Sequence, residues 1–558
     1  MMKENPKKNP AASDTAGTVE VAATSGGAKA ASAAIGTATS GAAKAAGMIS
    51  MMFLISRILG FVRESLAGSL FNRFETDSFF AAFVIPDVMY YLLVGGALSA
   101  AFIPVFTEYL TRGEEEEGWK MASTFINVAV IILACLTVLG IFFTKWLIPL
   151  EAPSFPKDKI GLLMSLTRIM FPAVCFTALA GLMGGVLNSY RQFFGPALGP
   201  NVYNIGIIAG AGLLGSAFGI HGMAYGVAAG AVGNFLTQLF FLRKHGRFYR
   251  FGYIDLRNRG FRKMLLLWVP ALIGLSADQV NIWATTAMAS ALPEGGITAI
   301  RFATRLVQLP IGIFAAGISM AFFPLLSSLV TQKKIEDYKD TLSLSLRTIF
   351  FIMAPAGIGL IILRVPIVTL LFARGKFTMQ DTDTTAYALF FYSLAVFAHA
   401  AILMLPRAFY ALQDTKTPVY VSMTAVGSSI LFNWLFLHYT TLGVGGFGIS
   451  FTIMGLVNML LLLAILRRKM GGIRGREITA SFLKAAASAL LMGVAIWVVL
   501  QLILPWSAPL SQHLGAAVQI AAGVTVGGAV YLLGAWLFKM DELHKVLGIF
   551  RRKFLRRA

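Results

Sequence analysis

Long apolar runs dominate this 558-residue chain from residue 47 onward. Each run is about 20 residues or longer, the length that an α-helix needs to cross roughly 30 Å of hydrocarbon. Short polar breaks separate the runs, so the sequence predicts an all-α polytopic membrane protein with about 14 transmembrane helices. The expected spans are 48–71, 79–110, 121–149, 160–188, 197–218, 222–242, 264–291, 297–329, 345–373, 385–411, 418–438, 446–466, 479–503 and 515–538.

The distribution of charge supports this assignment and predicts an orientation. Only 13% of the residues are charged, about half the share in a soluble domain. A soluble nucleic-acid-binding protein is therefore not expected, despite a net charge of +21. With the N-terminus inside, 32 of the 47 Lys and Arg residues fall in inner loops and tails. Because cytoplasmic loops carry the excess of Lys and Arg, both termini are predicted to be cytoplasmic.

The two chain ends differ from the spans in composition. Residues 1–46 are mostly Ala, Gly, Ser and Thr with scattered lysines, and they contain no run of large apolar residues. We expect a disordered cytoplasmic tail there, because such a segment cannot bury enough surface to fold. Residues 541–558 form a second, basic cytoplasmic tail. Cys135 and Cys175 both lie inside apolar runs, which excludes a disulfide scaffold.

Three sequence matches at a nearly constant offset indicate an internal duplication. Each match is weak alone, but the three occur in the same order. The matched pairs are 97–104 with 317–324 at an offset of 220, 187–196 with 409–418 at an offset of 222, and Gly222 and Asn234 with Gly446 and Asn458. Chance similarity between Gly- and Ala-rich helices is the alternative explanation.

A duplicated unit of six helices would place both copies in the same orientation, as in many secondary transporters with a central cavity. We predict an N-lobe at 47–250 with helices one to six and a C-lobe at 251–470 with helices seven to twelve. The two extra C-terminal helices, at 471–540, lie outside the repeat.

Charged residues inside the predicted spans indicate a site. Counted along ideal helices, Arg57 and Arg63 lie roughly 14 and 22 Å from the inner membrane boundary, and Arg305 lies roughly 12 Å from the outer one. Arg301 is one helical turn from Arg305 on the same face. An Arg at the bilayer centre costs about 2.5–3.5 kcal/mol, so such residues usually face a cavity or a partner. Arg57 and Arg63 differ by about 240° around an ideal helix, so one straight face cannot present both equally.

Two interpretations of these charges stay open. In the first, the arginines line a cationic cavity, with Glu64, Asp77 and Arg301 as supporting charges; arginine forks suit phosphate oxygens, so the cargo would carry an anionic head. In the second, Arg57–Glu64 and similar pairs are buried clamps between helices. Asp278 and Asn281 could hold a coupling cation or could be satisfied buried polar groups.

Motifs for catalysis, cofactors and metals fail their structural context. Residues 443–448 match GxGxxG, but no strand precedes them. The six histidines are scattered and show no zinc spacing. We therefore predict a transporter rather than an enzyme, with no catalytic residues, no cofactor and no metal site.

Five ordered motifs carry a family resemblance that runs from about residue 48 to the end of the last span. They are Ser56-Arg-Ile-Leu-Gly-Phe-Val-Arg-Glu64, Thr76-Asp-Ser-Phe-Phe-Ala-Ala-Phe83, Gly96-Ala-Leu-Ser-Ala-Ala-Phe-Ile-Pro104, Gly375-Lys-Phe-Thr378 and Gln413-Asp-Thr-Lys-Thr-Pro418. They resemble the MviN/MurJ family of lipid II flippases. This family belongs to the multidrug, oligosaccharidyl-lipid and polysaccharide exporter superfamily, whose members have two six-helix lobes.

The resemblance implies a function. It implies alternating-access transport of lipid II, the undecaprenyl-diphosphate-linked peptidoglycan precursor, from the inner to the outer leaflet of the bacterial cytoplasmic membrane. Family arginines important for this activity align with Arg57, Arg63 and Arg305, and the acidic position of the first loop aligns with Asp77. The segment 471–540 corresponds to a hydrophobic groove for the lipid tail.

The chain also departs from one branch of the family. Tyr90 and Tyr91 stand where that branch has an Arg pair, and Thr304 stands where an Asp can precede the helix-eight arginine. The expected partners are lipid II, membrane lipids and a coupling ion, without nucleic acid, and the protein is expected to act as a monomer. The alternatives are a cation-coupled small-molecule or drug antiporter and a polysaccharide-lipid flippase of the same superfamily. An intramembrane prenyl transferase would need a paired-carboxylate metal motif, which the sequence lacks.

Overall fold

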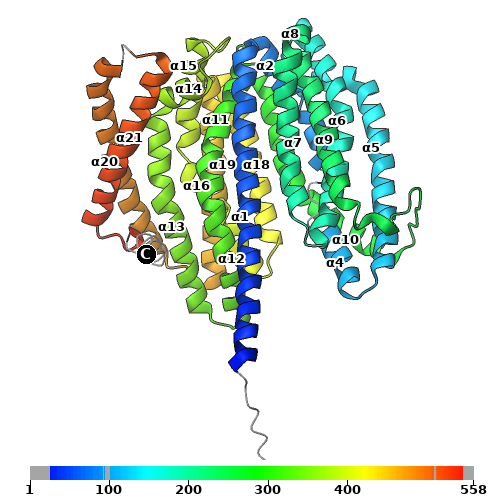
Figure 1. Ribbon diagram of the computed structural model, residues 1–558. Helices are drawn as coiled ribbons and strands as arrows, with labels where there is room; N and C mark the ends of the chain where they lie inside the picture. Colours follow the sequence, from blue (N-terminus) through cyan, green and yellow to red (C-terminus); the bar gives the residue numbers. More distant parts are fainter. Residues whose placement is uncertain (1–24, 92–93, 95–100, 508–509, 544–558) are drawn as a thin grey trace, which may run out of the picture. The chain divides into compact units, whose positions relative to one another are not determined.

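The computed structural model describes residues 25–91, 94, 101–507 and 510–543, and this part of the chain contains helices but no strand (Figure 1). It divides into two compact units, Met1–Leu54 and Ile55–Ala558. Helix α1 (Ser25–Leu70) runs from the first unit into the second, and it includes residues 25–46 of the predicted disordered tail. Residues 1–24 and 544–558 of the two predicted tails lie outside the described residues. All contacts below are within the second unit.

The helices up to residue 242 follow the first six predicted spans. The second span is divided into three short helices, and part of it lies outside the described residues. After α1 come α2 (Arg73–Ala81), α3 (Val84–Tyr90), α4 (Ile103–Thr111), α5 (Glu115–Glu151), α6 (Lys157–Ser189), α7 (Phe194–Ala209), the π-helical turn η3 (Gly210–Leu214), α8 (Gly215–Phe218) and α9 (Ile220–Leu242).

The remaining helices follow the later spans. They are the 3₁₀ turn η4 (Gly246–Phe248), α10 (Arg259–Ala289), α11 (Gly296–Pro310), the π-helical turn η5 (Ile311–Ala315), α12 (Ala316–Thr331), α13 (Ile335–Ile362), α14 (Arg364–Phe372), α15 (Met379–Ser393), α16 (Val396–Ile402), α17 (Leu405–Ala411), α18 (Lys416–Tyr439), α19 (Val444–Met470), α20 (Gly475–Ser507) and α21 (Gln512–Leu537).

Ten helical segments of the described chain are long and apolar enough to cross a membrane, or eleven if the bent pair at 379–411 counts as one span. These segments correspond to predicted spans three to six and eight to fourteen. The other three predicted spans fall in α1, in the interrupted segment 79–110 and in α10. The predicted all-helical, polytopic membrane fold is confirmed.

The chain reversals recur at the offsets of the sequence repeat. Residues with positive φ stand at equivalent turns although the side chains differ. The pairs are Gly113 and Lys333 (75° and 58°), Arg191 and Gln413 (58° and 60°), and Gly219 and Gly443 (57° and 52°). Their offsets of 220, 222 and 224 match those of the sequence repeat. The turns of the backbone therefore recur in the two copies although few of the side chains are the same.

Glycines explain how the weakly apolar fifth and sixth spans pack. A Cβ added at Gly206 would collide with the backbone of Gly230, and one added at Gly210 would collide with the backbone of Gly226. Helices α7 and α9 are thus in backbone contact, as small residues allow in membrane helices.

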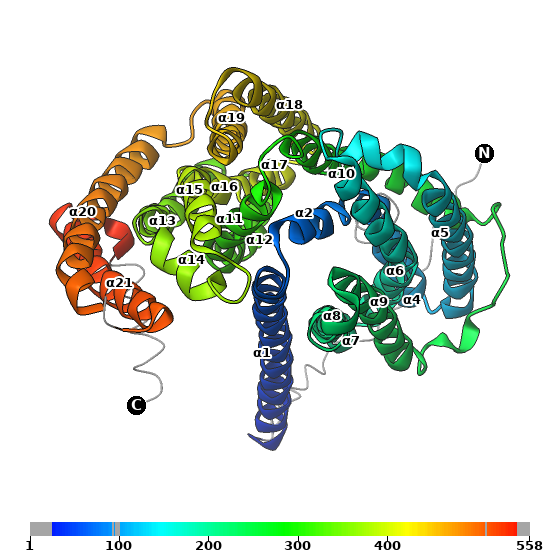
Figure 2. The same cartoon turned by 90° about the horizontal axis from the view of Figure 1, so that it is seen from above.

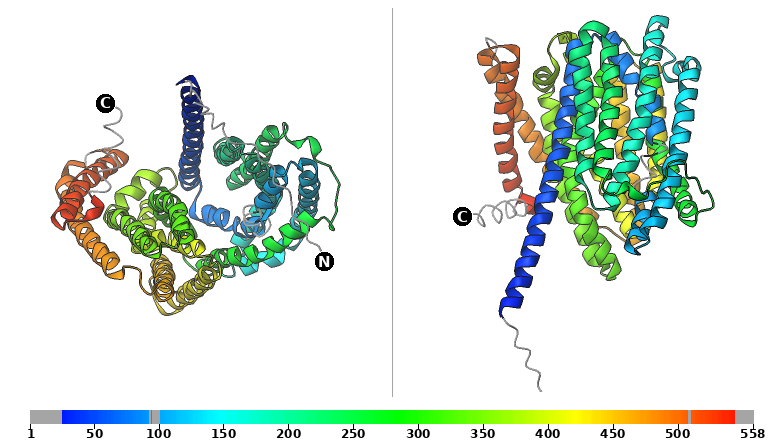
Figure 3. Two further views of the ribbon diagram at one scale, coloured as in Figure 1. Left: turned by 90° about the horizontal axis from the view of Figure 1, so that it is seen from below. Right: turned by 45° about the vertical axis from the view of Figure 1, so that its right-hand side comes forward.

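The helices of the second unit gather in groups (Figures 2 and 3). Helices α5, α6, α7 and α9 pack together, and α11, α13, α15, α18 and α19 form another set of neighbours. Helix α10 contacts both groups, through α3 and α5 on one side and α18 on the other. Helices α20 and α21 pair with each other and pack on α13 and α14.

Candidate functional site

A polar cavity of about 500 Å³ lies among α3, α10, α11, α18 and α19. Four charged side chains line it, namely Asp87 on α3, Asp278 on α10, and Arg301 and Arg305 on α11. Its volume is in the range of small-molecule sites, but its lining is more polar than theirs. The uncharged polar lining consists of Tyr91, Gln279, Asn281, Thr285, Thr286, Thr304, Gln308, Tyr392, Ser429 and Asn433.

Three arginines converge on one buried carboxylate beside this cavity. The Glu64 side chain on α1 is fully buried. Its Oε1 lies 3.2 Å from Arg63 Nη2 and 3.8 Å from Arg301 Nε, and its Oε2 lies 3.6 Å from Arg305 Nε. One negative charge against three positive ones leaves an excess of positive charge around Glu64, which favours an anionic ligand there, while Asp87 and Asp278 in the cavity carry the opposing charge.

The arginines reach across between α1 and α11 through gaps left by glycines. A Cβ added at Gly60 of α1 would collide with the Arg305 guanidinium, and one added at Gly312 of η5 would collide with the Arg57 guanidinium. Arg63 instead donates to Asn204 Oδ1 on α7, at 3.2 Å. Arg57 and Arg63 therefore point in different directions from α1, as their predicted angular separation requires: Arg57 lies against η5, and Arg63 contacts α7.

The structure brings Arg63, Glu64, Arg301 and Arg305 together, but only Arg301 and Arg305 also line the cavity. Within the described residues, Arg57 forms no ion pair, so the specific Arg57–Glu64 clamp is absent there. The carboxylate is held by Arg63 and the two α11 arginines instead.

The two residues considered for a coupling cation both line the cavity, one turn apart on α10. Asn281 Nδ2 lies 3.7 Å from Met454 Sδ, and Asn281 Oδ1 has no hydrogen-bond partner among the described residues. No cluster of three or more His, Cys, Asp or Glu suited to a metal ion occurs in the part of the chain that the structure describes. The sequence analysis did not include Asp87 among the site residues. Its position in the second span gives its depth in the membrane but not the direction in which this side of α3 faces.

Asp77 lies away from the cavity, at the end of the bundle that carries α2. Its side chain is buried and accepts hydrogen bonds from Lys159 Nζ (3.0 Å), the Gly295 amide (2.8 Å), and the amide and hydroxyl of Thr298 (2.9 and 2.7 Å). A carboxylate at a helix N-terminus satisfies amides that have no partner within the helix and interacts favourably with the helix dipole. Asp77 therefore joins α2 and α6 to the start of α11.

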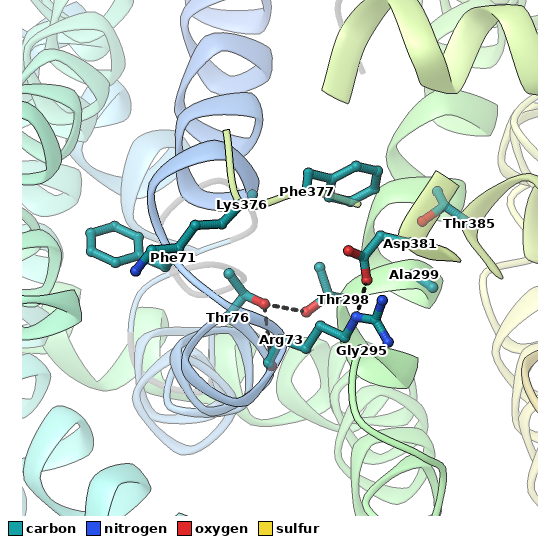
Figure 4. Close-up of a pocket in the computed structure, with 11 residues that line it drawn as sticks. Phe71, Arg73, Thr76, Gly295, Thr298, Ala299, Lys376, Phe377, Asp381 and Thr385 are labelled. Atoms are coloured by element: carbon teal, nitrogen blue, oxygen red, sulfur yellow. Dashed lines mark hydrogen bonds and ion pairs between the residues drawn. The ribbon is translucent and has the colours of Figure 1, made fainter. Parts of the chain in front are cut away.

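A second connection closes the same end, which we call the α2 end and define by the turns at 71–72, 152–156, 290–295 and 373–378. Arg73 pairs with Asp381 of α15 (Figure 4). It also donates to Thr378 Oγ1 and Gln380 Oε1. The Lys376 amide donates to the Ser69 carbonyl at 2.8 Å. The space among the residues drawn in Figure 4 is only about 10 Å³, so these side chains pack closely at the α2 end.

The opposite end carries the basic linker between α9 and α10, and we call it the linker end. Asn127 of α5 holds this linker: its Nδ2 donates to the Arg250 and Tyr253 carbonyls, and its Oδ1 accepts from the Tyr249 hydroxyl. The Arg250 guanidinium pairs with Glu116 at 2.8 Å, and both side chains are about half exposed.

The C-terminal helix pair is anchored on α13 by a polar cluster. Arg347 pairs with Glu542, Asp541 and Glu477, and Ser481 donates to the buried Glu542 at 3.0 Å. These contacts hold α20 and α21 beside α13.

Comparison with known proteins gives consistent relatives. The sequence pattern of the family described as Lipid II flippase MurJ matches residues 66–533. The probable lipid II flippase MurJ of Buchnera aphidicola subsp. Acyrthosiphon pisum is 32% identical over 490 residues, covering 87% of this chain and 95% of that protein. The lipid II flippase MurJ of Burkholderia cenocepacia is 29% identical over 498 residues, covering 88% and 96%.

Solved structures agree with these sequence matches. A lipid II flippase MurJ in an inward closed conformation has a TM-score of 0.74 and 26% identity, and the match covers 88% of this chain and 99% of that chain. A multidrug resistance transporter of the MATE family in an inward-facing conformation has a TM-score of 0.65 at 16% identity, covering 75% and 96%. The MATE transporter shares the fold.

Proposed function

The chain belongs to the MurJ family of lipid II flippases, and we propose that the arginines between α1 and α11 bind the diphosphate of lipid II during transport. The protein is a transporter of peptidoglycan synthesis, not an enzyme. The observation that carries the proposal is the convergence of Arg63, Arg301 and Arg305 on Glu64. Arg57 and Arg63 precede residue 66, where the family match begins, so their role rests on this geometry.

The charge balance indicates how binding would proceed. Glu64 offsets one guanidinium and limits the repulsion among the three while no anion is bound. A diphosphate in the cavity meets Arg301 and Arg305 first, because these two line it. Arginine forks bind phosphate oxygens in bidentate geometry, so the diphosphate competes with Glu64 for them. Arg57 and Arg63 extend the positive charge along α1.

The proposal includes a topology of 14 spans in the bacterial cytoplasmic membrane, with both termini and the linker end in the cytoplasm. Eight Lys and Arg residues between Arg243 and Lys263 support this orientation. This orientation places the α2 end on the outer side of the membrane. Alternating access follows from separation of α2 from α11, which moves lobe 47–250 against lobe 251–470, and the recurring turns support these two lobes.

The C-terminal pair at 471–540 is assigned to the lipid tail. Helix α20 exposes large apolar side chains, including Leu490, Val494 and Trp497, and Arg347 fixes the pair beside α13. A long polyprenyl chain would lie in this groove among membrane lipids while one copy of the protein carries the headgroup.

Asp278 and Asn281 are proposed to take a coupling cation in the cavity. If so, Asp278→Asn weakens the dependence of lipid II transport on an ion gradient and leaves resistance to cationic drugs unchanged. Altered drug resistance with normal lipid II transport would instead support an antiporter.

The decisive experiment measures lipid II on each leaflet in cells that depend on Arg305→Ala or Arg63→Ala. A hydrogen bond to a charged group contributes about 1.5–3 kcal/mol, so the transport rate should fall roughly 10- to 100-fold and lipid II should accumulate on the inner leaflet. Arg364→Ala is the matched control, because Arg364 donates to the Ile361 carbonyl at the end of α13 and lies over the Phe390 ring, and it forms no ion pair with Glu64. Normal outer-leaflet lipid II in the Arg305→Ala strain would overturn the assignment.

A further inference from the structure

A turn in the linker between α9 and α10 presents an apolar side chain on the outer side of the bundle. The Tyr253 amide donates to the Arg250 carbonyl, and Gly252 has a φ of 72°, which suits the third position of a β-turn. Phe251 stands at the tip of this turn and is 92% exposed. The linker runs past α5 on the outside of the bundle (Figures 1 and 2). The turn therefore holds Phe251 away from the rest of the protein.

Polar side chains of α5 fix this turn at a defined height. Asn127 Nδ2 donates to the carbonyls at both ends of the turn, each at 2.9 Å. The Ser123 and Thr124 hydroxyls accept hydrogen bonds from linker amides at 3.0 and 3.2 Å. All three side chains are buried. Counted along an ideal helix, they lie about 3–9 Å inside the inner boundary of the predicted span 121–149. In the orientation proposed above, the turn therefore lies where headgroups meet acyl chains.

The linker around the turn is basic and carries further exposed apolar side chains. Between Arg243 and Lys263 it has eight Lys and Arg residues but one acidic residue, Asp255. Ile254 and Leu256 are 42% and 57% exposed. Exposed apolar groups among Lys and Arg are typical of segments that lie in the interface of an anionic leaflet. Depth, charge and exposed apolar surface thus agree on one kind of surrounding.

We propose that the turn 250–253 is a membrane anchor, in which Phe251 inserts among the acyl chains of the inner leaflet and the linker arginines bind phosphates of anionic phospholipids. The proposal goes beyond the lipid II site and uses only the proposed orientation. A soluble partner would meet the cytoplasmic side of the linker, whereas the turn lies beside α5, where lipid surrounds the bundle (Figure 2). Because the linker joins lobe 47–250 to lobe 251–470, the anchor holds their junction at the membrane surface.

A fluorescence experiment tests the insertion. Bimane is attached to Phe251→Cys in the full-length protein without Cys135 and Cys175, in vesicles of phosphatidylcholine and phosphatidylglycerol with brominated acyl chains. We expect severalfold stronger quenching than with bimane on Lys334→Cys, an exposed position between α12 and α13. Val138→Cys, at a position 66% exposed on α5, is the positive control. Quenching at residue 251 no stronger than at residue 334 would overturn the proposal, because the turn would then face water or a soluble partner.

The same label tests the role of the arginines. Bromine is now carried either by the phosphatidylglycerol or by the phosphatidylcholine, at equal amounts of the two lipids. We expect stronger quenching by brominated phosphatidylglycerol at residue 251 and equal quenching by the two lipids at Val138. In Arg257→Gln/Arg259→Gln, which alters two exposed arginines, this preference should fall by up to about fivefold for each charge removed. Equal quenching at residue 251 with both arginines present would overturn the binding of anionic phospholipid.

A third measurement separates this inference from the proposed function. The vesicles contain no lipid II, so absence of quenching at residue 251 would refute the anchor and leave the diphosphate site unaffected. In intact cells, an impermeant maleimide should not label Lys334→Cys. Labelling there would contradict the proposed orientation, and with it the inner-leaflet position of the turn.

Discussion

The two ends of the bundle hold the halves of the chain together in different ways. At the α2 end, the buried Asp77 carboxylate accepts bonds from α6 of the first half and from the start of α11 in the second. At the linker end, Lys263 and Glu108 form an ion pair that joins the halves. Their side chains are 54% and 35% exposed. The charged groups that join the halves are thus buried at the α2 end and solvated at the linker end, where the neutral Asn127 amide makes the buried contact.

This difference shows which end is stabilised in the present conformation. Exposed ion pairs contribute about 0–1 kcal/mol, whereas removal of one partner from a buried pair costs about 3–5 kcal/mol. Opening the linker end therefore requires little energy, and opening the α2 end requires that buried groups find other partners.

The largest effect is expected from Asp77→Asn. The substitution leaves the Lys159 ammonium, which is 3% exposed, without a carboxylate. We expect a loss of about 3–5 kcal/mol in the stability of the fold around the α2 end. The measurement is maleimide labelling of a cysteine at the buried position Ala299, in a protein without Cys135 and Cys175, together with the melting temperature. Labelling should become faster and the melting temperature should fall.

The double variant Asp77→Asn/Lys159→Met separates charge from shape. Removal of both charges should restore part of the lost stability, because no unpaired ion then stays buried. If the single variant labels Ala299→Cys at the wild-type rate, the α2 end does not depend on this pair and the contrast between the two ends fails.

From the sequence alone, the helical spans and the depth of the charged residues could be predicted, but the residues that pair with these charges could not. The run lengths gave the spans, and i, i+4 spacing placed Arg301 beside Arg305 on one face. The Asp77 bonds to Lys159 and to the amides of Gly295 and Thr298 could not be predicted, because they depend on which helix ends become neighbours. The same holds for Glu64, whose α11 partners are more than 230 residues away in the sequence.

A smaller effect is expected from Arg73→Ala at the α2 end. The variant loses the ion pair with Asp381 and bonds to Thr378 and Gln380, but the Asp381 carboxylate keeps its bonds to Thr378 at the start of α15. We expect a loss of about 1–2 kcal/mol, since the group is partly exposed. The Ala299→Cys labelling rate should therefore rise less than with Asp77→Asn.

Arg374→Ala is the matched control, because Arg374 lies in the 373–378 turn at the same end and its side chain donates to the Leu370 carbonyl of α14. A faster labelling rate in this control, equal to that of Arg73→Ala, would mean that any change in the turn opens the α2 end.

At the linker end, Asp414 forms polar contacts with residues of its own half of the chain. These contacts do not join the two halves, so they are not expected to affect the separation of the halves. Partial burial of Asp414 acts to raise its pKa, but hydrogen bonds from Lys469 and from the amide and hydroxyl of Thr417 lower the pKa to about 2, from the ordinary 3.8. A lowered pKa stabilises the folded turn fully above the unfolded pKa, and this stabilisation is lost as pH falls from about 4 to about 2.

Hydrogen exchange of the peptide 409–420 measures this effect. In the wild type, the amide exchange rate, corrected for its intrinsic pH dependence, should rise as the pH falls from about 4 to about 2. In Asp414→Asn it should already be faster at pH 7 and should change little on acidification. An unchanged wild-type profile between pH 4 and pH 2 would show that Asp414 does not stabilise the turn.

The smallest effect is expected from Glu116→Gln at the linker end. Arg250 loses an ion pair in which both side chains are about half exposed, while the linker keeps the Asn127 bonds to the Arg250 and Tyr253 carbonyls. Because an exposed pair gains little from attraction in water, the change should be below about 0.5 kcal/mol and the melting temperature should shift by less than about 2 °C. Ala299→Cys labelling should stay at the wild-type rate. A larger shift in either measurement would mean that a solvated pair at the linker end contributes as much as a partly buried one, and the two ends would then differ in exposure but not in strength.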